Sequence, residues 1–320
     1  MSTILIADFG FKNIDPEQAV ATAAGHAIVS AQCRTAAEVI TAVRSTRPAA
    51  LLVQWASINA EVIAALPETV RVIVRYGIGV DNVDLAAASA RGLPVCNVPD
   101  YCLDEVADHT LALALALARQ LPQTHTRTLA GTWKITPPAP MPAFRTLIFA
   151  TAGYGRIARR VIARAKGFGF NLAAYDPFVP AEAFAADGVR RLEPDELFAL
   201  SDILSLHLPL TADTRHFVGG PRLARLKPTA LVVNTSRGGL IDTHALAGAL
   251  AAGRIAGAGI DVFEAEPLEP DHPLRAAPNA ILTSHTAWFS EQSVPQLQHL
   301  AAEEAVRVLR GEAPRNRVNR

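Results

Sequence analysis

Short apolar runs separated by polar segments repeat along most of the chain, at spacings typical of alternating strands and helices. In the first part these runs lie at residues 4–7, 27–29, 51–53, 72–74 and 95–97. The segments between them, such as 36–45 and 59–65, space their apolar residues as amphipathic helices do. Strands that are apolar throughout and alternate with helices are typical of a parallel sheet covered on both faces. We therefore predict a doubly wound α/β domain over this part.

The same alternation resumes after residue 146. Strands are predicted at 147–152, 172–175, 203–206, 231–234, 259–262 and 280–282, and helices from Arg156 onward, at 221–226, 244–252 and 291–309. Between the two halves, residues 100–119 predict a long, apolar helix with an acidic first turn. The stretch from there to Phe144 is rich in Pro, Thr and Ala, with an isolated Trp133, and predicts an irregular arm.

The segment 147–176 combines a strand, a tight glycine turn, a helix, a second strand and an acid. Gly153 allows a sharp turn, and Gly155 allows the backbone to approach a pyrophosphate bound at the N-terminus of the following helix. Asp176 follows at the distance at which a carboxylate binds the ribose hydroxyls of an adenosine, and it favours NAD over NADP because it would repel a phosphate. With Ala158 in the third glycine position, the pattern favours dinucleotide binding over a purely structural turn.

Composition narrows the class of protein. A chain of 320 residues suggests two domains, and its 30 basic and 30 acidic residues give no net charge that would indicate binding to nucleic acid or to a membrane surface. The cysteines, Cys33, Cys96 and Cys102, form no metal-spaced set, and an odd number suits a reducing compartment. We therefore expect no metal site. The short apolar run near the N-terminus predicts a strand rather than a signal peptide, so we expect a cytoplasmic protein.

One loop of the first domain, RYGIGVDNVD from Arg75 to Asp84, allows two interpretations. Gly77 and Gly79 directly follow a strand and would expose backbone N–H groups to a small anion, with Arg75 adding positive charge. A tight turn capped by Asp81 or Asn82, with Arg75 paired to a nearby acid, explains the spacing equally well.

Three polar residues follow consecutive predicted strands, where ligands bind in doubly wound sheets. They are Arg237, Glu266 and His285. A histidine that is hydrogen-bonded to a carboxylate can hold a proton near neutral pH, and an arginine can bind a carboxylate and polarise the adjacent carbonyl. Singly, each residue has an equally good structural explanation. Together, beside a dinucleotide turn, they predict reduction of a 2-oxo acid.

At this point the chain resembles the D-isomer-specific 2-hydroxyacid dehydrogenases along nearly its whole length. The resemblance lies in RYGIGVDNVD, GYGRIA with Asp176, HLPLT, NTSRGGLID, DVFEAEP and SHTAW. Within that family, NVPDYCLDEVADHTLALALALAR and HTAWFSEQS are most similar to the subgroup of C-terminal-binding proteins and their phosphoglycerate dehydrogenase-like relatives.

The resemblance implies two doubly wound parallel-sheet domains with a cleft between them. Residues 1–98 and 287–320 would form a flavodoxin-like substrate domain, and residues 99–286 a Rossmann NAD-binding domain. The implied catalytic residues are Arg237, Glu266 and His285, and the implied substrate-binding residues are Arg75, Ile78, Gly79, Tyr101 and Trp288. NAD would be bound by Gly153, Tyr154, Gly155, Arg156, Ile157, Asp176, His207, Pro209, Thr235, Asp261 and Thr110. A homodimer is implied as well.

The chain departs from the family pattern at four positions. Thr146 and Ala150 stand where glycine is common, Thr151 replaces an aliphatic residue, and Ser284 replaces the proline before the histidine. These departures bear on nucleotide binding and on the orientation of His285. Two other functions stay open: an NAD(H)-sensing, corepressor-like interaction protein with vestigial activity, and a D-3-phosphoglycerate dehydrogenase.

Overall fold

The structure is a computed structural model that describes residues 2–319. The chain divides into two compact units. Unit 1 contains the residues up to Cys102 and those from Phe289 onward, and unit 2 contains Leu103–Trp288. The predicted division after residues 98 and 286 lies a few residues before these positions. Each unit is built on its own parallel sheet, which confirms the predicted fold class of two doubly wound α/β domains.

Unit 2 contains a seven-stranded parallel sheet. Its strands are β6 (Ile148–Ala152), β7 (Asn171–Tyr175), β8 (Arg190–Arg191), β9 (Ile203–Leu206), β10 (Leu231–Asn234), β11 (Gly257–Ile260) and β12 (Ala280–Leu282). Their order in the sheet is β12-β11-β10-β9-β6-β7-β8. The chain thus moves outward from β6 to β8 and then returns to β9 on the other side of β6. Ligands of doubly wound sheets bind at the strand ends beside such a reversal.

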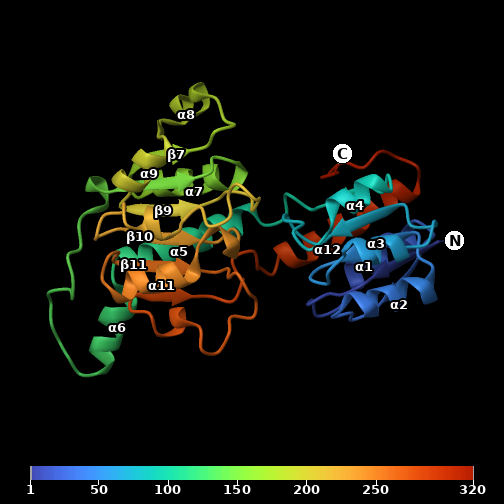
Figure 1. Cartoon of the computed structure of the whole chain (residues 1–320), viewed down its shortest axis with the longest axis horizontal. Coiled ribbons are helices and arrows are strands. Elements are labelled where there is room, and N and C mark those ends of the chain that lie inside the picture. Colours follow the sequence, from blue (N-terminus) through green and yellow to red (C-terminus); the bar gives the residue numbers. More distant parts are fainter. Residues whose placement is uncertain (1, 320) are drawn as a thin grey trace. The chain divides into compact units, whose positions relative to one another are not determined.

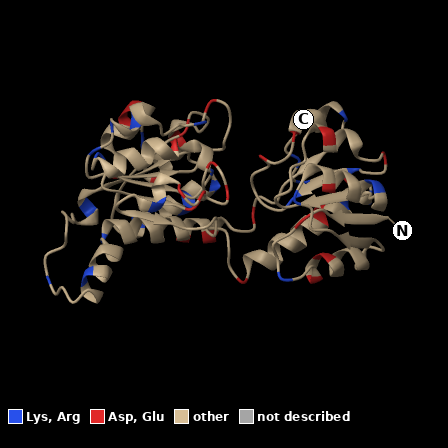
Figure 2. Cartoon of the chain, turned by 60° about the horizontal axis from the view of Figure 1, so that its bottom comes forward, with Lys and Arg blue, Asp and Glu red and all other residues tan. Residues whose placement is uncertain are grey.

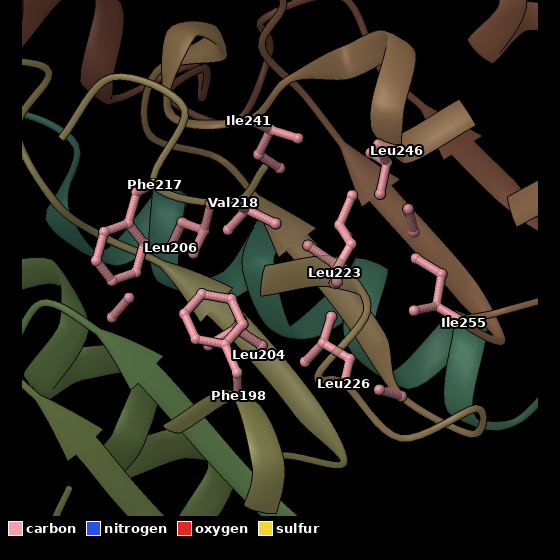
Figure 3. Close-up of a cluster of buried hydrophobic side chains, with 14 of the residues drawn as sticks. Phe198, Leu204, Leu206, Phe217, Val218, Leu223, Leu226, Ile241, Leu246 and Ile255 are labelled. Carbon is pink, nitrogen blue, oxygen red and sulfur yellow. The ribbon is translucent and has the colours of Figure 1, made fainter. Parts of the chain in front are cut away.

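Helices cover both faces of this sheet because alternate strand residues point to opposite sides. Figure 3 shows one face, where Leu204 and Leu206 pack with Phe198 and with side chains from the later helices. Their neighbour Ile203 packs on the other face, in a cluster with side chains of three further helices. The helices of unit 2 are α5 (Leu103–Ala118), α6 (Leu121–Leu129), α7 (Arg156–Gly167), α8 (Ala181–Asp187), α9 (Pro194–Leu200), α10 (Gly220–Leu223) and α11 (Thr243–Ala251).

Unit 1 contains a five-stranded parallel sheet. Its strands are β1 (Thr3–Ile6), β2 (Ala27–Ser30), β3 (Ala50–Val53), β4 (Val72–Arg75) and β5 (Val95–Cys96), in the order β2-β1-β3-β4-β5. This is the strand order of flavodoxin-like folds. The helices of this unit are α1 (Asp15–Ala23), α2 (Ala36–Thr46), α3 (Ala60–Ala65), α4 (Leu85–Ala90) and, from the other end of the chain, α12 (Ser293–Leu309).

Buried hydrogen bonds join α12 to the N-terminal part of unit 1. The Glu17 carboxylate of α1 is fully buried and accepts hydrogen bonds from Tyr76 Oη (2.9 Å) and from Gln298 Nε2 of α12 (2.8 Å). At the far end of α12, Arg71 donates to the carbonyl of Leu309 at 3.0 Å. Figure 1 shows α12 lying among the N-terminal elements. The two ends of the sequence therefore complete one unit.

The segment 120–144, predicted to be irregular throughout, begins with a helix, α6. The proline at position 122 does not prevent the helix because it occupies the first turn, where no intrahelical N–H bond is lost. Thr124, Thr126 and Thr128 each donate a side-chain hydrogen bond to the carbonyl four residues earlier. The remainder of the segment, 130–143, contains neither helix nor strand, as predicted, and extends from the body of unit 2 in Figure 1.

Smaller differences concern element boundaries. Strand β11 lies at Gly257–Ile260, two residues earlier than predicted, and α10 ends at Leu223 although a helix to Leu226 was expected. Lys, Arg, Asp and Glu are interspersed over both units in the view of Figure 2. The three cysteines are buried. Within residues 2–319, every helix is too short or too polar to cross a bilayer.

Candidate functional site

Arg237, Glu266 and His285 follow three strands that are neighbours in the sheet of unit 2. Arg237 follows β10, Glu266 follows β11 and His285 follows β12, and these strands pair in the order β12-β11-β10. Adjacent strands lie about 4.8 Å apart. The sheet therefore carries the three side chains at one edge, as the sequence predicted.

His285 and Glu266 form a hydrogen-bonded pair. His285 Nδ1 lies 2.7 Å from Glu266 Oε2, and the two side chains are 25% and 33% exposed. The other carboxylate oxygen of Glu266 accepts a bond from the backbone N–H of Phe263 at 2.9 Å. Burial acts to raise the pKa of Glu266, but its hydrogen bond to His285, the charge of that ring and the Phe263 N–H together hold the pKa below its ordinary value. Glu266 is therefore an ionised acceptor for the imidazole.

The loop that carries His285 is attached to the end of β11. Asp261 is fully buried. Its Oδ1 accepts bonds from Thr283 Oγ1 (2.6 Å) and from the N–H of Thr286 (2.9 Å), and its Oδ2 accepts from the N–H of Ala287 (3.0 Å). The N–H of His285 donates to the carbonyl of Asp261 at 2.8 Å. One aspartate thus binds the chain on both sides of the histidine.

The turn that carries Arg237 is fixed by the buried side chain of Asn234. Asn234 Nδ2 donates to the carbonyl of Arg237 at 2.9 Å, and Asn234 Oδ1 accepts from the N–H of Ser236 at 3.1 Å. The next residue, Gly238, packs against the backbone of Phe263, where a Cβ atom would overlap the main chain. Glycine at this position therefore allows the Arg237 turn to approach the loop that carries Glu266.

The glycine turn after β6 has the conformation that its sequence predicted. Gly153 has a φ of 96°, and a Cβ atom here would lie within overlap distance of the carbonyl of His207. Gly155 is exposed, and a Cβ at this position would have no neighbour within 4 Å. Helix α7 begins directly afterwards at Arg156. The turn thus presents open space in front of a helix N-terminus, as a pyrophosphate requires.

Asp176 follows β7 beside this turn. Its Oδ2 accepts a bond from the N–H of Tyr154 at 2.8 Å, and its Oδ1 accepts from the N–H of Phe178 at 2.9 Å. The carboxylate is half-buried, and each of its oxygens can accept a further hydrogen bond. Asp176 therefore combines a fixed orientation with capacity for ribose hydroxyls.

Other predicted cofactor residues are held by ring contacts and side-chain hydrogen bonds. The ring of Tyr154 is buried, stacks on Phe184 at 4.4 Å and donates to Asp187 at 2.6 Å, so only its backbone faces the turn. Thr110 is fully buried and donates to the carbonyl of Val106, so Thr235 donates to Thr110 across a distance of 2.7 Å.

His207, at the end of β9, is held neutral. Desolvation lowers its pKa to about 3, and its Nε2 lies 2.9 Å from Ser205 Oγ. Its N–H donates to the carbonyl of Ala152 at 2.7 Å. The neighbouring Pro209 is exposed. This part of the site therefore carries no charge that changes near neutral pH.

The geometry agrees with what the chain is similar to. Residues 111–287 match the model of the D-isomer specific 2-hydroxyacid dehydrogenase NAD-binding domain. The chain is 40% identical over 268 residues to a glyoxylate reductase of Korarchaeum cryptofilum, a match that covers 82% of this chain and 80% of the relative. The chain belongs to the D-isomer specific 2-hydroxyacid dehydrogenase family. It is therefore an NAD-dependent oxidoreductase of 2-hydroxy acids.

Two further relatives of this dehydrogenase extend the comparison. A D-3-phosphoglycerate dehydrogenase of Methanocaldococcus jannaschii is 40% identical over 253 residues, which are 79% of this chain but only 48% of the relative. The crystal structure of a glyoxylate reductase from Paecilomyes thermophila superposes with a TM-score of 0.88 at 27% identity, covering 99% of this chain and 98% of that one. The dehydrogenase thus spans most of one relative and about half of the other.

The candidate substrate residues of the dehydrogenase lie in both units. In unit 1, Arg75 ends β4, and its guanidinium lies 5.5 Å from the Trp55 ring. The loop after β4 is held by a bond from Asn97 to the carbonyl of Ile78 at 2.6 Å. Tyr101 is buried, whereas Ile78 and Gly79 are half-buried. Trp288 is the last residue of unit 2 and is half-buried.

The four departures from the family pattern lie in different surroundings. Thr146 is exposed and ends a short 3-10 helix, η1 (Phe144–Thr146). Ala150 and Thr151 are fully buried in β6, and among residues 2–319 the Thr151 hydroxyl is one of a few buried side-chain atoms without a hydrogen-bond partner. Ser284 is exposed. Ala150 and Thr151 therefore change the buried strand that precedes the glycine turn and not the exposed face of the turn.

Sequence reasoning missed the residues that hold the site together. These include Asn234 beneath Arg237 and Thr283 beside His285. Asn234 lies within the NTSRGGLID motif, and its side-chain partners Ser236 and Arg237 follow it in the same turn. Thr283 precedes the SHTAW motif, and its partners lie on α5 and after β11, which a single sequence does not reveal.

Proposed function

We propose that this protein interconverts a small 2-oxo acid and the D-2-hydroxy acid, with His285 as general acid and base, Glu266 as its partner and Arg237 as the substrate ligand. The 2.7 Å pair of His285 and Glu266, which follows neighbouring strands in the NAD-binding unit, carries the proposal. Bound NADH would supply the hydride. The residues of the chain would bind, orient and protonate the substrate.

The hydrogen bond to Glu266 assigns the two nitrogens of His285 to different tasks. Because Glu266 is an ionised acceptor, Nδ1 carries a proton toward it. Nε2 is then the nitrogen that gives a proton to the forming alkoxide during reduction and removes it during oxidation. Glu266 stabilises the imidazolium form and fixes the plane of the ring.

Arg237 would bind the carboxylate of the substrate and polarise its carbonyl. A guanidinium offers two parallel N–H groups that match a carboxylate, so it sets the direction from which the carbonyl carbon is presented. The buried Asn234 and the close contact of Gly238 support this role because they fix the backbone on both sides of Arg237.

The residues that would hold NAD fit a dinucleotide. The open position at Gly155 and the N-terminus of α7 at Arg156 and Ile157 would take the pyrophosphate. Asp176 would accept the ribose hydroxyls. The neutral His207, with Pro209 and Thr235, would line the remaining path along the ends of β9 and β10.

The substrate is proposed to be small. Arg75, Ile78, Gly79 and Tyr101 would bind the carboxylate end, and Trp288 would border the side-chain end. Relatives named glyoxylate reductase and D-3-phosphoglycerate dehydrogenase support glyoxylate and phosphohydroxypyruvate as candidates.

A substrate panel tests the proposal. Purified protein is mixed with NADH and with pyruvate, glyoxylate, hydroxypyruvate, a branched 2-oxo acid or phosphohydroxypyruvate, and the absorbance of NADH is followed. Turnover of at least one unphosphorylated acid is expected, with the D-isomer as product wherever the product is chiral. Turnover of phosphohydroxypyruvate alone would replace the proposal by the phosphoglycerate dehydrogenase function. NADH binding without any turnover would favour the NAD-sensing function.

We also propose that the protein is a cytoplasmic homodimer. Four large apolar side chains of α6 and the following segment are exposed, namely Leu121, Leu129, Trp133 and Ile135. Beside them lies a cavity of about 400 Å³, lined by Leu117, Pro140 and Leu231 among others. Exposed apolar surface next to a cavity supports contact with a second copy. Light scattering would test this, and a monomer at micromolar concentration would contradict it.

A further inference from the structure

The side chain of Glu264 connects the segments that follow three neighbouring strands. Glu264 itself follows β11, and its Oε1 lies 2.6 Å from Nε2 of His216, in the segment after β9. Its Oε2 accepts bonds from the N–H (3.2 Å) and from Oγ1 (3.0 Å) of Thr243, the first residue of α11, which follows β10. The three strands pair in the order β11-β10-β9. One carboxylate therefore joins the three segments.

The hydrogen bonds that reach Glu264 through Thr243 have a defined direction. His272 is buried, and this burial, with a positive charge on the neighbouring His244, lowers its pKa, so the ring is neutral near pH 7. Its Nδ1 accepts the N–H of Leu274 at 3.2 Å. The ring proton is therefore on Nε2, which donates to Thr243 Oγ1, also at 3.2 Å. Thr243 in turn donates its own hydroxyl proton to Glu264.

Glu264 is held in its ionised form. Burial acts to raise the pKa of Glu264, but the bonds from His216 and Thr243 together hold the pKa below its ordinary value. The side chain is 25% exposed, and Arg215 adds a longer ion pair at 3.6 Å. A negative charge at the N-terminus of a helix, here α11, is also favourable. At neutral pH the carboxylate is therefore an acceptor for each of these donors.

His216 is a second fixed point of the arrangement. Its backbone is left-handed, with a φ of 51°, and residues other than glycine rarely adopt this conformation unless the surroundings enforce it. The N–H of His216 donates to the carbonyl of Gly239 at 2.8 Å, while its ring binds Glu264. The main chain of His216 thus holds the turn that carries Arg237, and its side chain holds the loop after β11.

The loop that Glu264 holds also carries Glu266. One oxygen of Glu266 accepts the N–H of Phe263 at 2.9 Å, and the other lies 2.7 Å from Nδ1 of His285. Phe263, the backbone donor, directly precedes Glu264 in the chain. A shift of Glu264 would therefore change the position from which Glu266 reaches the imidazole.

We propose that Glu264 is a positioning residue, which joins the segments after β9, β10 and β11 and thereby fixes the loop from which Glu266 reaches His285. The inference rests on the proposed function for its kinetic test but not for its structural test. A small misplacement of the groups around a reacting atom can lower turnover strongly, even when the change lies away from the chemistry.

The test compares two substitutions of Glu264. Glu264→Ala removes every hydrogen bond of the carboxylate, whereas Glu264→Gln is the conservative variant that should restore them. The amide oxygen of glutamine can accept both donors of Thr243. Its NH₂ group can donate to Nε2 of His216 once the imidazole proton has moved to Nδ1.

Glu196→Ala is the matched control. Glu196 also accepts a backbone N–H, from Glu193 at 3.3 Å, and also pairs with an arginine, Arg190 at 3.2 Å. It lies in α9, which follows β8, the outermost strand on the other side of the sheet. Thermal unfolding of all three variants would measure the general cost of removing such a carboxylate.

We expect Glu264→Ala to lower kcat about 10- to 100-fold at saturating NADH, with a dissociation constant of NADH that changes less than about threefold. Glu264→Gln should recover a kcat within about threefold of the wild type, and Glu196→Ala should keep normal kcat. NMR of the wild type should show a strongly deshielded Nδ1 proton of His285, bound to Glu266. This signal should shift or broaden in Glu264→Ala and return in Glu264→Gln.

Three results would overturn the proposal. Normal kcat with an unaltered His285 signal in Glu264→Ala would exclude positioning. Weaker NADH binding with normal kcat would instead make Glu264 a support of the cofactor site. An equal loss of kcat in Glu196→Ala would attribute the effect to general destabilisation.

His216→Asn provides a second, milder variant in case Glu264→Ala does not fold. Asparagine tolerates the left-handed backbone, and its side chain does not extend as far as Nε2 of the imidazole. A kcat about three- to tenfold lower is expected with unchanged NADH affinity. A fully active His216→Asn protein with an unaltered His285 signal would contradict the proposal. If the wild type turned over no 2-oxo acid, the proposed function would fail, and the NMR signal alone would decide the role of Glu264.

Discussion

The two units use the same device at the end of a strand, with different results. In unit 1, Asp8 follows β1, is buried, and accepts the N–H groups of Gln54 (3.0 Å) and Trp55 (2.6 Å) from the loop after the neighbouring β3. In unit 2, Asp261 follows β11 and accepts two N–H groups from the loop after the neighbouring β12. Each aspartate ties the exit of one strand to that of the next.

The difference lies in what the tethered loop carries. The loop held by Asp8 contains Gln54 and Trp55, whereas the loop held by Asp261 contains His285 in a left-handed conformation. The comparison teaches that a buried aspartate at a strand end holds the neighbouring loop in place. This restraint matters for activity only when the loop carries an acid–base residue.

His285→Ala tests the chemical side of the comparison and has the largest expected effect. General acid–base catalysis contributes about 10²- to 10⁴-fold, so kcat should fall by at least that much while the NADH dissociation constant stays within about threefold. The Asp261 tether uses other groups of the loop, so the thermal midpoint should change little. Steady-state kinetics and NADH titration would measure this. His299→Ala, which removes an exposed histidine of α12, is the control. Near-normal turnover in His285→Ala would refute the assignment.

Gly238→Ala tests whether activity depends on the close contact between the Arg237 turn and the Glu266 loop. The added methyl group would overlap the backbone of Phe263, so the Arg237 turn must move away from the Glu266 loop. We expect kcat/KM to fall about 10- to 100-fold.

Gly248→Ala is the control for that variant, because Gly248 lies on the exposed side of α11 with open space around it. This second change should leave activity unchanged and stabilise the protein by about 0.5–1 kcal/mol. Equal activity of the two variants would show that the loop contact is dispensable.

Asp8→Asn tests the tether of unit 1. It should lower the free energy of unfolding by about 1–3 kcal/mol because it weakens two hydrogen bonds to a buried carboxylate. Without an acid–base residue in the tethered loop, kcat should stay within about threefold of the wild type. Denaturant unfolding and kinetics would measure both quantities. A kcat more than about tenfold below that of the wild type would remove the distinction between the two tethers.

Glu17→Gln has the smallest expected effect, which is on the pH dependence of stability. Glu17 accepts hydrogen bonds from side chains, whereas Asp8 and Asp261 accept them from backbone N–H groups. Burial raises the pKa of Glu17 above its ordinary value of 4.5, although its hydrogen bonds oppose this. The folded state therefore binds the proton more tightly than the unfolded chain, and stability falls as pH rises from about 4.5 through the raised pKa. Glu17→Gln should flatten that decline, whose slope for a single proton is at most about 1.4 kcal/mol per pH unit.

Glu68→Gln, at an exposed acid of the same unit, is the control for this pH dependence. Its unfolding free energy, measured by denaturant titration from pH 4 to 8, should follow the wild-type curve. An unchanged slope in Glu17→Gln would mean that the carboxylate of Glu17 is ionised at no cost to folding.

The strands and the three polar residues after β10, β11 and β12 could be predicted from the sequence because they depend on local patterns. Apolar runs identify buried parallel strands, and the glycine turn with Asp176 identifies the strand, turn and helix around it. The helix α6 could not be predicted in this way, since the content of Pro and Thr was interpreted as an irregular arm although Pro122 occupies a first turn. The task of Asp261 was also hidden, because its partners belong to a loop more than twenty residues later in the chain.

The place of α12 in unit 1 has a consequence for how the protein is made. This helix packs on α1, β3 and β4, and Gln298 completes the hydrogen bonding of the buried Glu17. During synthesis, the first hundred residues emerge long before α12, so α1, β3 and β4 lack this packing partner while unit 2 is translated. The NAD-binding unit is therefore the first unit whose residues have all been synthesised, and it can fold first. Unit 1, whose synthesis begins earlier, can complete its fold only after α12 has been made.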